Sequence, residues 1–157
     1  MPLPDLTPQS QDRLWLVSSP LPWPLGPMAR HAWLVVQLAD QAPQRWEVWQ
    51  SPHRSPLSWG HVHRDLCGPF EGMALWPGWR CGRRAWAARI EAEAVGETAR
   101  QVAEFLNHQA PNYTHRNHYR FFPGPNSNSF VAWALASCRL AWVLPWTAWG
   151  RNYPIEV

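Results

Sequence analysis

The sequence contains no lysine: its fourteen basic residues are all arginine, and eleven acidic residues leave a net charge of +3. No run of basic residues accompanies this small excess, so the charge does not predict a nucleic-acid partner. Cysteine is also scarce. The three cysteines, Cys67, Cys81 and Cys138, include no CxxC pair. An odd set without this spacing favours a reducing compartment over a secreted domain held by disulfides.

A long apolar run is missing as well. The most apolar window, residues 130–149, contains Arg139 near its middle and Pro145 near its end. An arginine at the centre of a membrane helix costs about 2.5–3.5 kcal/mol on insertion scales. The first residues, MPLPDLTPQSQDRLW, also lack the basic start and apolar stretch of a signal peptide. We therefore expect a cytoplasmic protein without a transmembrane segment.

Proline and tryptophan are abundant instead, with seventeen and thirteen residues in a chain of 157. The length corresponds to one ordinary domain, and 46% hydrophobic residues are enough to form a core. Frequent proline favours short elements joined by rigid loops. Most tryptophans are expected to fill the core. Trp59, Trp76 and Trp79 lie in the least regular part of the sequence and are the candidates for an exposed binding surface.

The N-terminal part of the chain differs from the rest. Residues 1–29 are rich in proline and show no periodicity, so we predict an irregular arm that packs through Trp15, Leu16 and Trp23. The remaining residues 30–157 are predicted to form a single domain.

Two segments predict a β-hairpin. The β-branched and aromatic run HAWLVVQL begins at His31 and is typical of a buried strand, and the alternating segment RWEVWQ begins at Arg45. If Leu38 pairs with Arg45, His53 lies close to His31 and could orient its ring, although a slip of one residue would remove this contact. Glu47 lies too far along the hairpin to be a good candidate for this role.

The second half of the chain predicts two helices and further strands. Alternation indicates a half-buried strand over residues 85–93, and an apolar stripe predicts a helix over residues 97–108. A second helix is expected over residues 127–138, and short strands over residues 118–122 and 140–144. The predicted fold class is therefore α+β, an antiparallel sheet packed by two helices.

The segment with the most chemical content is PGPNSNSF, residues 123–130. A rigid turn places the hydroxyl of Ser127 at a helix N-terminus, where free backbone N–H groups could stabilise an oxyanion. The hydroxyl needs a base to take its proton, and His31 is the early histidine on a strong strand. The alternative is structural, since Asn126 and Ser127 are common helix-capping residues.

Three segments resemble an uncharacterised bacterial family, domain of unknown function 3750. They are HAWLVVQL, the PGPNSNSF block and the closing LPWTAWGR. The resemblance spans residues 30–153 and implies no established activity.

A more distant resemblance is to the circularly permuted papain-like fold of the lecithin–retinol acyltransferase group. In that fold a strand histidine precedes a cysteine in an Asn-Cys-x-x-Phe context, and here Asn126-Ser127-Asn128-Ser129-Phe130 has serine in the cysteine position. The resemblance implies Ser127 as nucleophile, His31 as general base and an oxyanion site at Asn126 and Asn128. It also implies amide or ester acyl groups as substrates. A serine depends more on its base than a thiolate does.

Other residues near the motif are weaker candidates. Tyr119 and Arg120 precede it and could line a substrate pocket. The seven histidines include His61 and His63 two residues apart, but no CxxC or HExxH accompanies them, so we predict no metal ion and no cofactor. The leading function is thus a serine-for-cysteine hydrolase or acyltransferase. The alternative is an inert binding module that holds a peptide, glycan or lipid in the same cleft, and the oligomeric state stays open.

Overall fold

Six antiparallel strands form one sheet in the computed structural model, which describes residue 4 and residues 10–78 and 84–157. Across the sheet the strands follow the order β4-β5-β3-β2-β1-β6. In chain order they are β1 (Arg13–Pro20), β2 (Arg30–Gln37), β3 (Gln44–Val48), β4 (Ser58–Trp59), β5 (Val62–Arg64) and β6 (Arg89–Val95). Strand β6 is the half-buried strand predicted over residues 85–93, displaced toward the C-terminus.

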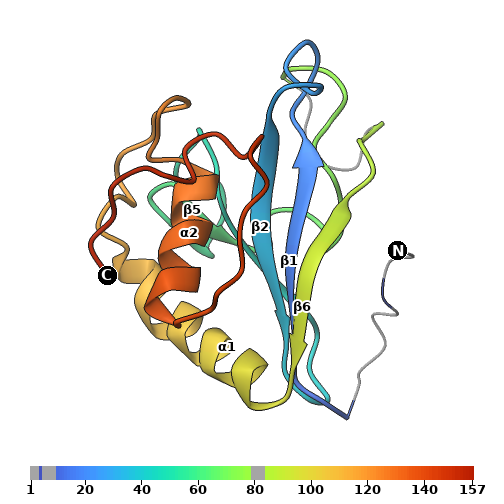
Figure 1. The fold of residues 1–157 in the computed structure, drawn as a ribbon, viewed down its shortest axis with the longest axis vertical. Coiled ribbons are helices and arrows are strands. Elements are labelled where there is room, and N and C mark those ends of the chain that lie inside the picture. Colours follow the sequence, from blue (N-terminus) through green and yellow to red (C-terminus); the bar gives the residue numbers. More distant parts are fainter. Residues whose placement is uncertain (1–3, 5–9, 79–83) are drawn as a thin grey trace.

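Two helices lie on one face of this sheet (Figure 1). They are α1 (Glu97–Gln109), which continues into the short 3-10 helix η1 (Ala110–Asn112), and α2 (Ser127–Ser137). Both predicted helices are confirmed to within one residue at each end. The buried stripe of α1 is also the predicted one: Ala99, Val102, Ala103 and Leu106. The α+β class is therefore confirmed.

Strand β1 is paired on both sides, with β2 and with β6. The prediction of an irregular arm over residues 1–29 is therefore wrong for Arg13–Pro20, and so is a domain boundary after residue 29. Every residue of β1 except its two ends is buried. A strand covered on both faces has no polar side to alternate with its apolar one, which removes the usual strand pattern from the sequence.

Strands β2 and β3 form the predicted hairpin in a different register. Val35, not Leu38, pairs with Arg45, a shift of three residues from the prediction. The reason is that the turn begins at Leu38, whose carbonyl accepts from the N–H of Gln41 at 3.0 Å, so this residue cannot continue the ladder. Because side chains alternate along a strand, an odd shift changes which β3 residues share a face with His31.

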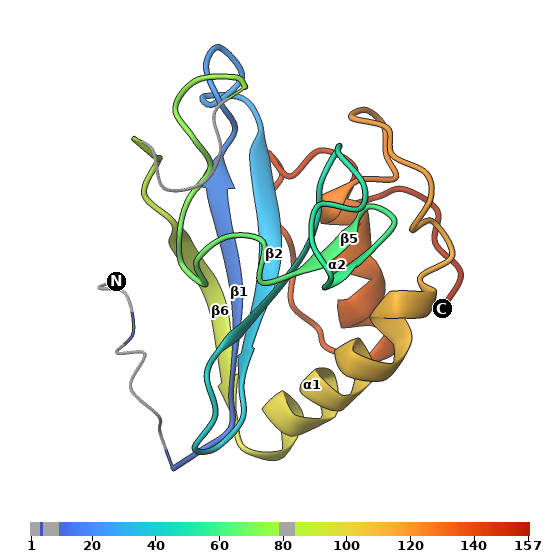
Figure 2. The ribbon, with the colours of Figure 1, turned by 180° about the vertical axis from the view of Figure 1, so that it is seen from behind.

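The two faces of the sheet carry separate cores. Ala32, Leu34 and Val36 of β2 pack against the helices in the larger core. Trp33 and Val35 point the other way, into a smaller core that includes Phe70. The loop that follows β5 covers this second face (Figure 2), and the indole N–H of Trp33 donates to the carbonyl of Pro69 in that loop at 2.8 Å.

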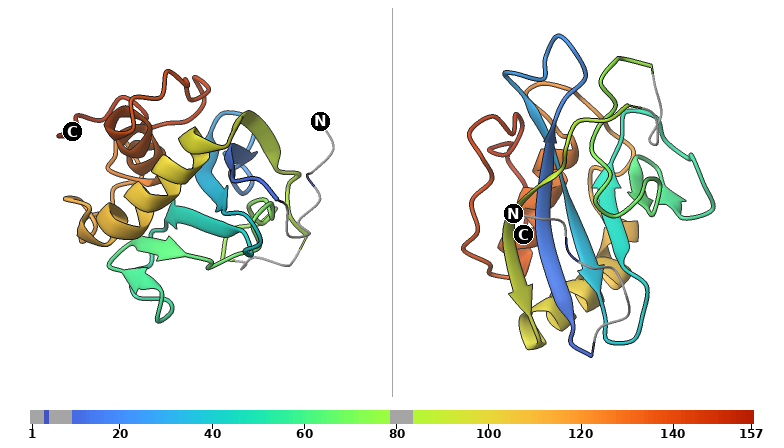
Figure 3. Two further views of the ribbon diagram at one scale, coloured as in Figure 1. Left: turned by 90° about the horizontal axis from the view of Figure 1, so that it is seen from below. Right: turned by 90° about the vertical axis from the view of Figure 1, so that its right-hand side faces the viewer.

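The C-terminal residues form no strand. The segments predicted as strands over residues 118–122 and 140–144 are irregular, so both predictions are wrong. The chain after α2 runs beside this helix on the same face of the sheet (Figure 3), and its Leu144 and Ala148 are buried in the larger core. The segment then returns to β2, where the N–H of Arg30 donates to the carbonyl of Thr147 at 2.9 Å. None of the described helices is long and apolar enough to cross a membrane.

The cysteines depart from the sequence-based expectation. Cys67 is disulfide-bonded, whereas Cys138 is a free cysteine. The cysteines therefore no longer support a reducing compartment, and the compartment stays a prediction.

Of the tryptophans expected at the surface, Trp59 is half-buried and stacks on Trp46, with ring centroids 5.7 Å apart. Trp76 is 49% exposed as predicted, and Trp79 lies outside the described residues.

Candidate functional site

The N-terminus of α2 is closed by a capping box. The side-chain oxygen of Asn126 accepts from the N–H groups of Asn128 at 2.9 Å and Ser129 at 3.3 Å. In return the Ser129 hydroxyl accepts from the N–H of Asn126 at 3.3 Å. The structure thus confirms helix capping by Asn126. The two N–H groups that Asn126 satisfies are not free to stabilise an oxyanion, which removes part of the predicted oxyanion site.

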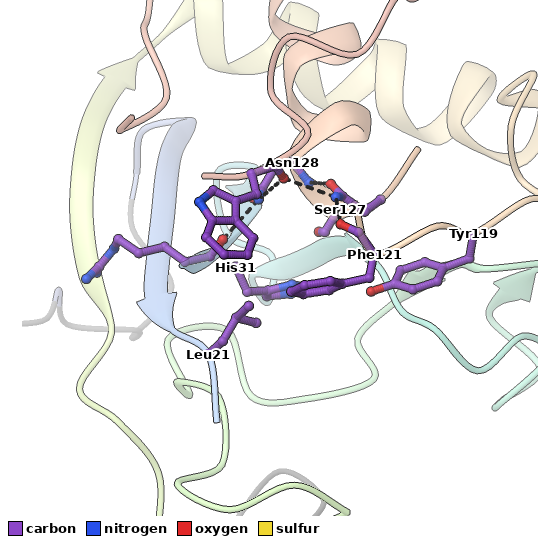
Figure 4. Close-up of a pocket in the computed structure, with 9 residues that line it drawn as sticks. Leu21, His31, Tyr119, Phe121, Ser127 and Asn128 are labelled. Atoms are coloured by element: carbon purple, nitrogen blue, oxygen red, sulfur yellow. Dashed lines mark hydrogen bonds between the residues drawn. The ribbon is translucent and has the colours of Figure 1, made fainter. Parts of the chain in front are cut away.

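The asparagine amides of this motif also tie distant segments together. Asn128 Oδ1 accepts from the N–H of Ala32 at 2.9 Å, and its Nδ2 donates to the carbonyls of Arg30 at 2.9 Å and Trp149 at 2.7 Å. Asn126 Nδ2 donates to the carbonyls of Phe121 at 2.9 Å and Trp149 at 3.0 Å. Figure 4 marks as dashed lines the hydrogen bonds between Asn128 and the other residues that are drawn. The helix N-terminus is therefore fastened to β2 and to the C-terminal segment.

The hydroxyl of Ser127 is held by the backbone on both sides. Its Oγ donates to the carbonyl of Ala32 at 2.6 Å and accepts from the N–H of Val48 at 3.2 Å. The residue is 3% exposed. Among the described residues no hydrogen bond joins Ser127 to the ring of His31, the predicted general base. The hydroxyl proton is already engaged with the β2 backbone, so Ser127 bridges β2 and β3 in this structure.

The ring of His31 is oriented by Glu47 and not by His53. Its Nε2 donates to Glu47 Oε2 at 2.8 Å. His53 is exposed, and its backbone N–H donates to the carbonyl of Gly60 at 2.9 Å. Glu47 was expected to lie too far along the hairpin, but the observed register places its side chain on the same face as His31. A buried acidic residue in the middle of a strand was the available signal, since such a carboxylate requires a partner.

Glu47 belongs to a buried charge network on the smaller core. Arg45 Nη2 lies 2.7 Å from Glu47 Oε2, and its Nη1 donates to the carbonyls of Gly68 at 2.9 Å and Glu71 at 2.6 Å. The guanidinium also stacks over the Trp33 ring at 4.0 Å. Burial by itself raises the pKa of Glu47, but Arg45 and His31 outweigh it and lower that pKa to about 2.

This lowered pKa predicts a loss of stability in acid. A carboxyl group whose pKa is depressed in the folded state stabilises the fold above its unfolded pKa of about 4.3, and that contribution disappears as the pH falls toward 2. We therefore expect the difference in unfolding free energy between the wild type and Glu47→Gln to shrink by about 3 kcal/mol from neutral pH to about pH 2. Urea denaturation at a series of pH values measures it. A difference that is constant with pH would contradict the lowered pKa.

A pocket lies where the start of β2 meets the N-terminus of α2 (Figure 4). It is small, with a free volume of about 20 Å³, and is lined by Leu21, Arg30, His31, Tyr119, Phe121, Asn126, Ser127, Asn128 and Trp149. The structure thus brings five predicted site residues to one pocket. Arg120 is exposed and does not line this pocket. Leu21, Arg30, Phe121 and Trp149 were not predicted, because tertiary contacts alone place them there.

A second serine–histidine pair lies elsewhere in the sheet. Ser58 Oγ lies 2.7 Å from His63 Nδ1, and His63 Nε2 lies 3.0 Å from the carbonyl of Ser51. Burial lowers the pKa of His63. Neither Ser58 nor His63 lines the pocket. No group of three or more His, Cys, Asp or Glu side chains that could hold a metal ion exists within the described part of the chain.

Comparison with known proteins gives one match. The model of the DUF3750 family, whose description is a protein of unknown function, matches residues 16–153 and therefore most of the chain. The match includes the greater part of β1, which the sequence resemblance left out. No curated protein and no solved structure matches significantly, so no relation to a papain-like fold follows. The chain belongs to the DUF3750 family.

Proposed function

We propose that this protein is a binding module whose pocket at the N-terminus of α2 holds a ligand without covalent catalysis by Ser127. The observation that carries the proposal is the state of the Ser127 hydroxyl, whose donor is used by the Ala32 carbonyl at 2.6 Å and which also accepts from the Val48 N–H. A nucleophilic serine instead needs its hydroxyl within hydrogen-bond reach of a base. His31 uses its Nε2 for Glu47.

The lining of the pocket indicates the chemistry of the ligand. His31 Nδ1 and the Tyr119 hydroxyl make no hydrogen bond with any described residue, so both are available to a ligand. Phe121, Trp149 and Leu21 supply apolar walls. The free volume of about 20 Å³ has room for a group of about the size of one water molecule, so only a small terminal group of a ligand would enter the pocket. These features support a small polar group on an apolar or ring-bearing frame, such as the end of a peptide, a glycan or a lipid.

Substitution of Ser127 separates binding from catalysis. Ser127→Ala leaves the Ala32 carbonyl and the Val48 N–H without a partner, so we expect the unfolding free energy to fall by about 1–3 kcal/mol. Binding should change little. Ligand contact is followed by the amide NMR shifts of residues 126–128 during titration with an N-acetyl dipeptide amide, a methyl glycoside or a short-chain phospholipid. Ser137→Ala, at the other end of α2, is the matched control.

The second candidate is an acyl hydrolase or acyltransferase of the permuted papain-like kind. It is supported by the placement of Ser127 and His31 in one pocket and by the carboxylate of Glu47 on the histidine, an arrangement that a general base uses. In this mechanism Ser127 must release the Ala32 carbonyl and donate its proton to His31 Nδ1.

Turnover of p-nitrophenyl acetate and butyrate decides between the two candidates. The binding module predicts equal background rates for the wild type and Ser127→Ala. A loss of several orders of magnitude in Ser127→Ala, with Ser137→Ala unaffected, would instead establish the hydrolase.

A further inference from the structure

Two loops form an exposed tip at one end of the sheet. Residues 21–29 connect β1 to β2, and residues 72–78 belong to the connection between β5 and β6. Both reach the same end of the molecule in two opposite views (Figures 1 and 2). The N–H of Trp23 donates to the carbonyl of Leu75 at 2.8 Å and joins the loops. We refer to these two loops together as the tip.

Large apolar side chains are exposed on the tip. Trp23 and Met28 are each 52% exposed, and Trp76 from the second loop is 49% exposed. Single exposed apolar residues are common on soluble proteins, but three large ones on two joined loops indicate a contact surface. Tryptophan is also enriched where proteins meet the boundary between lipid tails and headgroups, because its ring is apolar and its N–H is polar.

The backbone of the first loop is suited to a surface with little water. A lipid environment penalises every N–H group that has no partner in the protein. Three residues of the loop are prolines and have no N–H group: Pro22, Pro24 and Pro27. Others donate within the chain, at 2.8–3.0 Å: Leu21, Trp23, Leu25, Met28 and Ala29. The loop can therefore enter an apolar boundary while leaving almost no backbone donor unsatisfied.

The two loops of the tip carry no acidic residue, although Glu71 and Glu91 lie next to the segments around it. Residues 21–29, 72–78 and 84–89 contain no aspartate or glutamate, although the whole chain has eleven acidic residues. Arg84 in the third segment is exposed, whereas the exposed Arg89 is paired with Glu91 at 2.9 Å. The N–H of Leu75 donates to the carbonyl of Arg84 at 2.9 Å, which holds this arginine beside the tip. Arginine next to exposed tryptophan complements anionic headgroups below an apolar boundary.

We propose that the tip docks on a lipid surface with anionic headgroups, with Trp23, Met28 and Trp76 at the boundary of the apolar layer. The inference goes beyond ligand binding in the pocket and does not depend on it. Leu21, at the base of the tip, also lines the pocket. Docking would therefore hold the pocket close to the lipid surface.

Co-sedimentation of the full chain with vesicles tests the proposal. Vesicles of phosphatidylcholine with phosphatidylglycerol should bind the protein, and vesicles of phosphatidylcholine alone should bind it less. Trp23→Ser and Trp76→Ser should each weaken binding by about tenfold or more. Arg84→Gln should weaken it by about fivefold, with a smaller dependence on salt. Trp146→Ser is the matched control, because Trp146 is 75% exposed but lies outside the tip.

Each of the following outcomes would overturn the proposal. The first is a wild type that does not sediment with the anionic vesicles. The second is a Trp146→Ser variant that loses as much binding as Trp23→Ser. The third is seen by analytical ultracentrifugation without lipid: a wild-type oligomer that Trp23→Ser and Trp76→Ser convert to a monomer would assign the tip to contact between protein chains. Thermal unfolding of all variants confirms that the compared proteins are folded.

Discussion

Replacing Glu47 with alanine should lower the free energy of unfolding by about 3–5 kcal/mol. The substitution leaves the guanidinium of Arg45 buried beside an empty space, because this side chain is 1% exposed and its only anionic partner is Glu47 within the described residues. It also removes the acceptor of His31 Nε2. Urea denaturation monitored by circular dichroism measures the change.

Two further variants test whether the loss of stability in Glu47→Ala comes from the buried pair of Arg45 and Glu47. Glu104→Ala removes the same group from the exposed side of α1 and should change stability by less than about 0.5 kcal/mol. The double variant Arg45→Met with Glu47→Met removes both charges and should recover part of the loss, because well-packed apolar groups often replace a buried ion pair without destabilisation. If Glu47→Ala is as stable as Glu104→Ala, the buried network does not exist as described.

Asn128→Ala should destabilise the protein by about 3 kcal/mol or more. The substitution leaves the N–H of Ala32 and the carbonyl of Arg30 without the amide that they contact at 2.9 Å. Each unsatisfied buried group costs about 1–3 kcal/mol. The carbonyl of Trp149 keeps one partner, since Asn126 Nδ2 also donates to it. Thermal and urea unfolding give the size of the effect.

The test of Asn128→Ala uses a control variant at an exposed asparagine and a local measurement, hydrogen exchange. Asn112→Ala removes an exposed amide whose contact to the carbonyl of His108 is 3.3 Å long, and it should be nearly neutral. In Asn128→Ala, hydrogen exchange should rise at the N-terminus of α2 and in residues 146–151 before it rises in α1. Uniform exchange with no loss of stability would show that Asn128 does not fasten these segments.

The buried residues of the PGPNSNSF motif show why a sequence block that suggests chemistry can have a structural role. Gly150 has φ +90°, and a Cβ atom there would lie 2.4 Å from Asn126 Nδ2. Ser129 Oγ donates to the carbonyl of the same glycine at 2.7 Å. The blocks PGPNSNSF and LPWTAWGR, far apart in the chain, therefore meet and depend on each other. Their joint presence in the sequence reflects this contact in the fold.

The elements whose signals are local could be predicted from the amino-acid sequence. Helix α2 follows from the N-cap residues at its start and from an apolar segment, all within a few residues. Helix α1 follows from one apolar stripe between Gly96 and Pro111. The predicted pocket residues next to the cap, Ser127 and Asn128, were found for the same reason, because a helix N-terminus places its first side chains without help from the rest of the chain.

The tertiary structure alone decided how distant segments combine. Strand β1 carries no alternation since both of its faces are buried, so only its pairing with β2 and β6 reveals it. The register of β2 and β3 depends on where the turn begins, and a shift of three residues moved Glu47 to the face of His31. The role of Ser127 was likewise decided by the strands that it contacts. The sequence specifies the chemistry of each side chain. Strand register and long-range packing determine which backbone groups that side chain contacts.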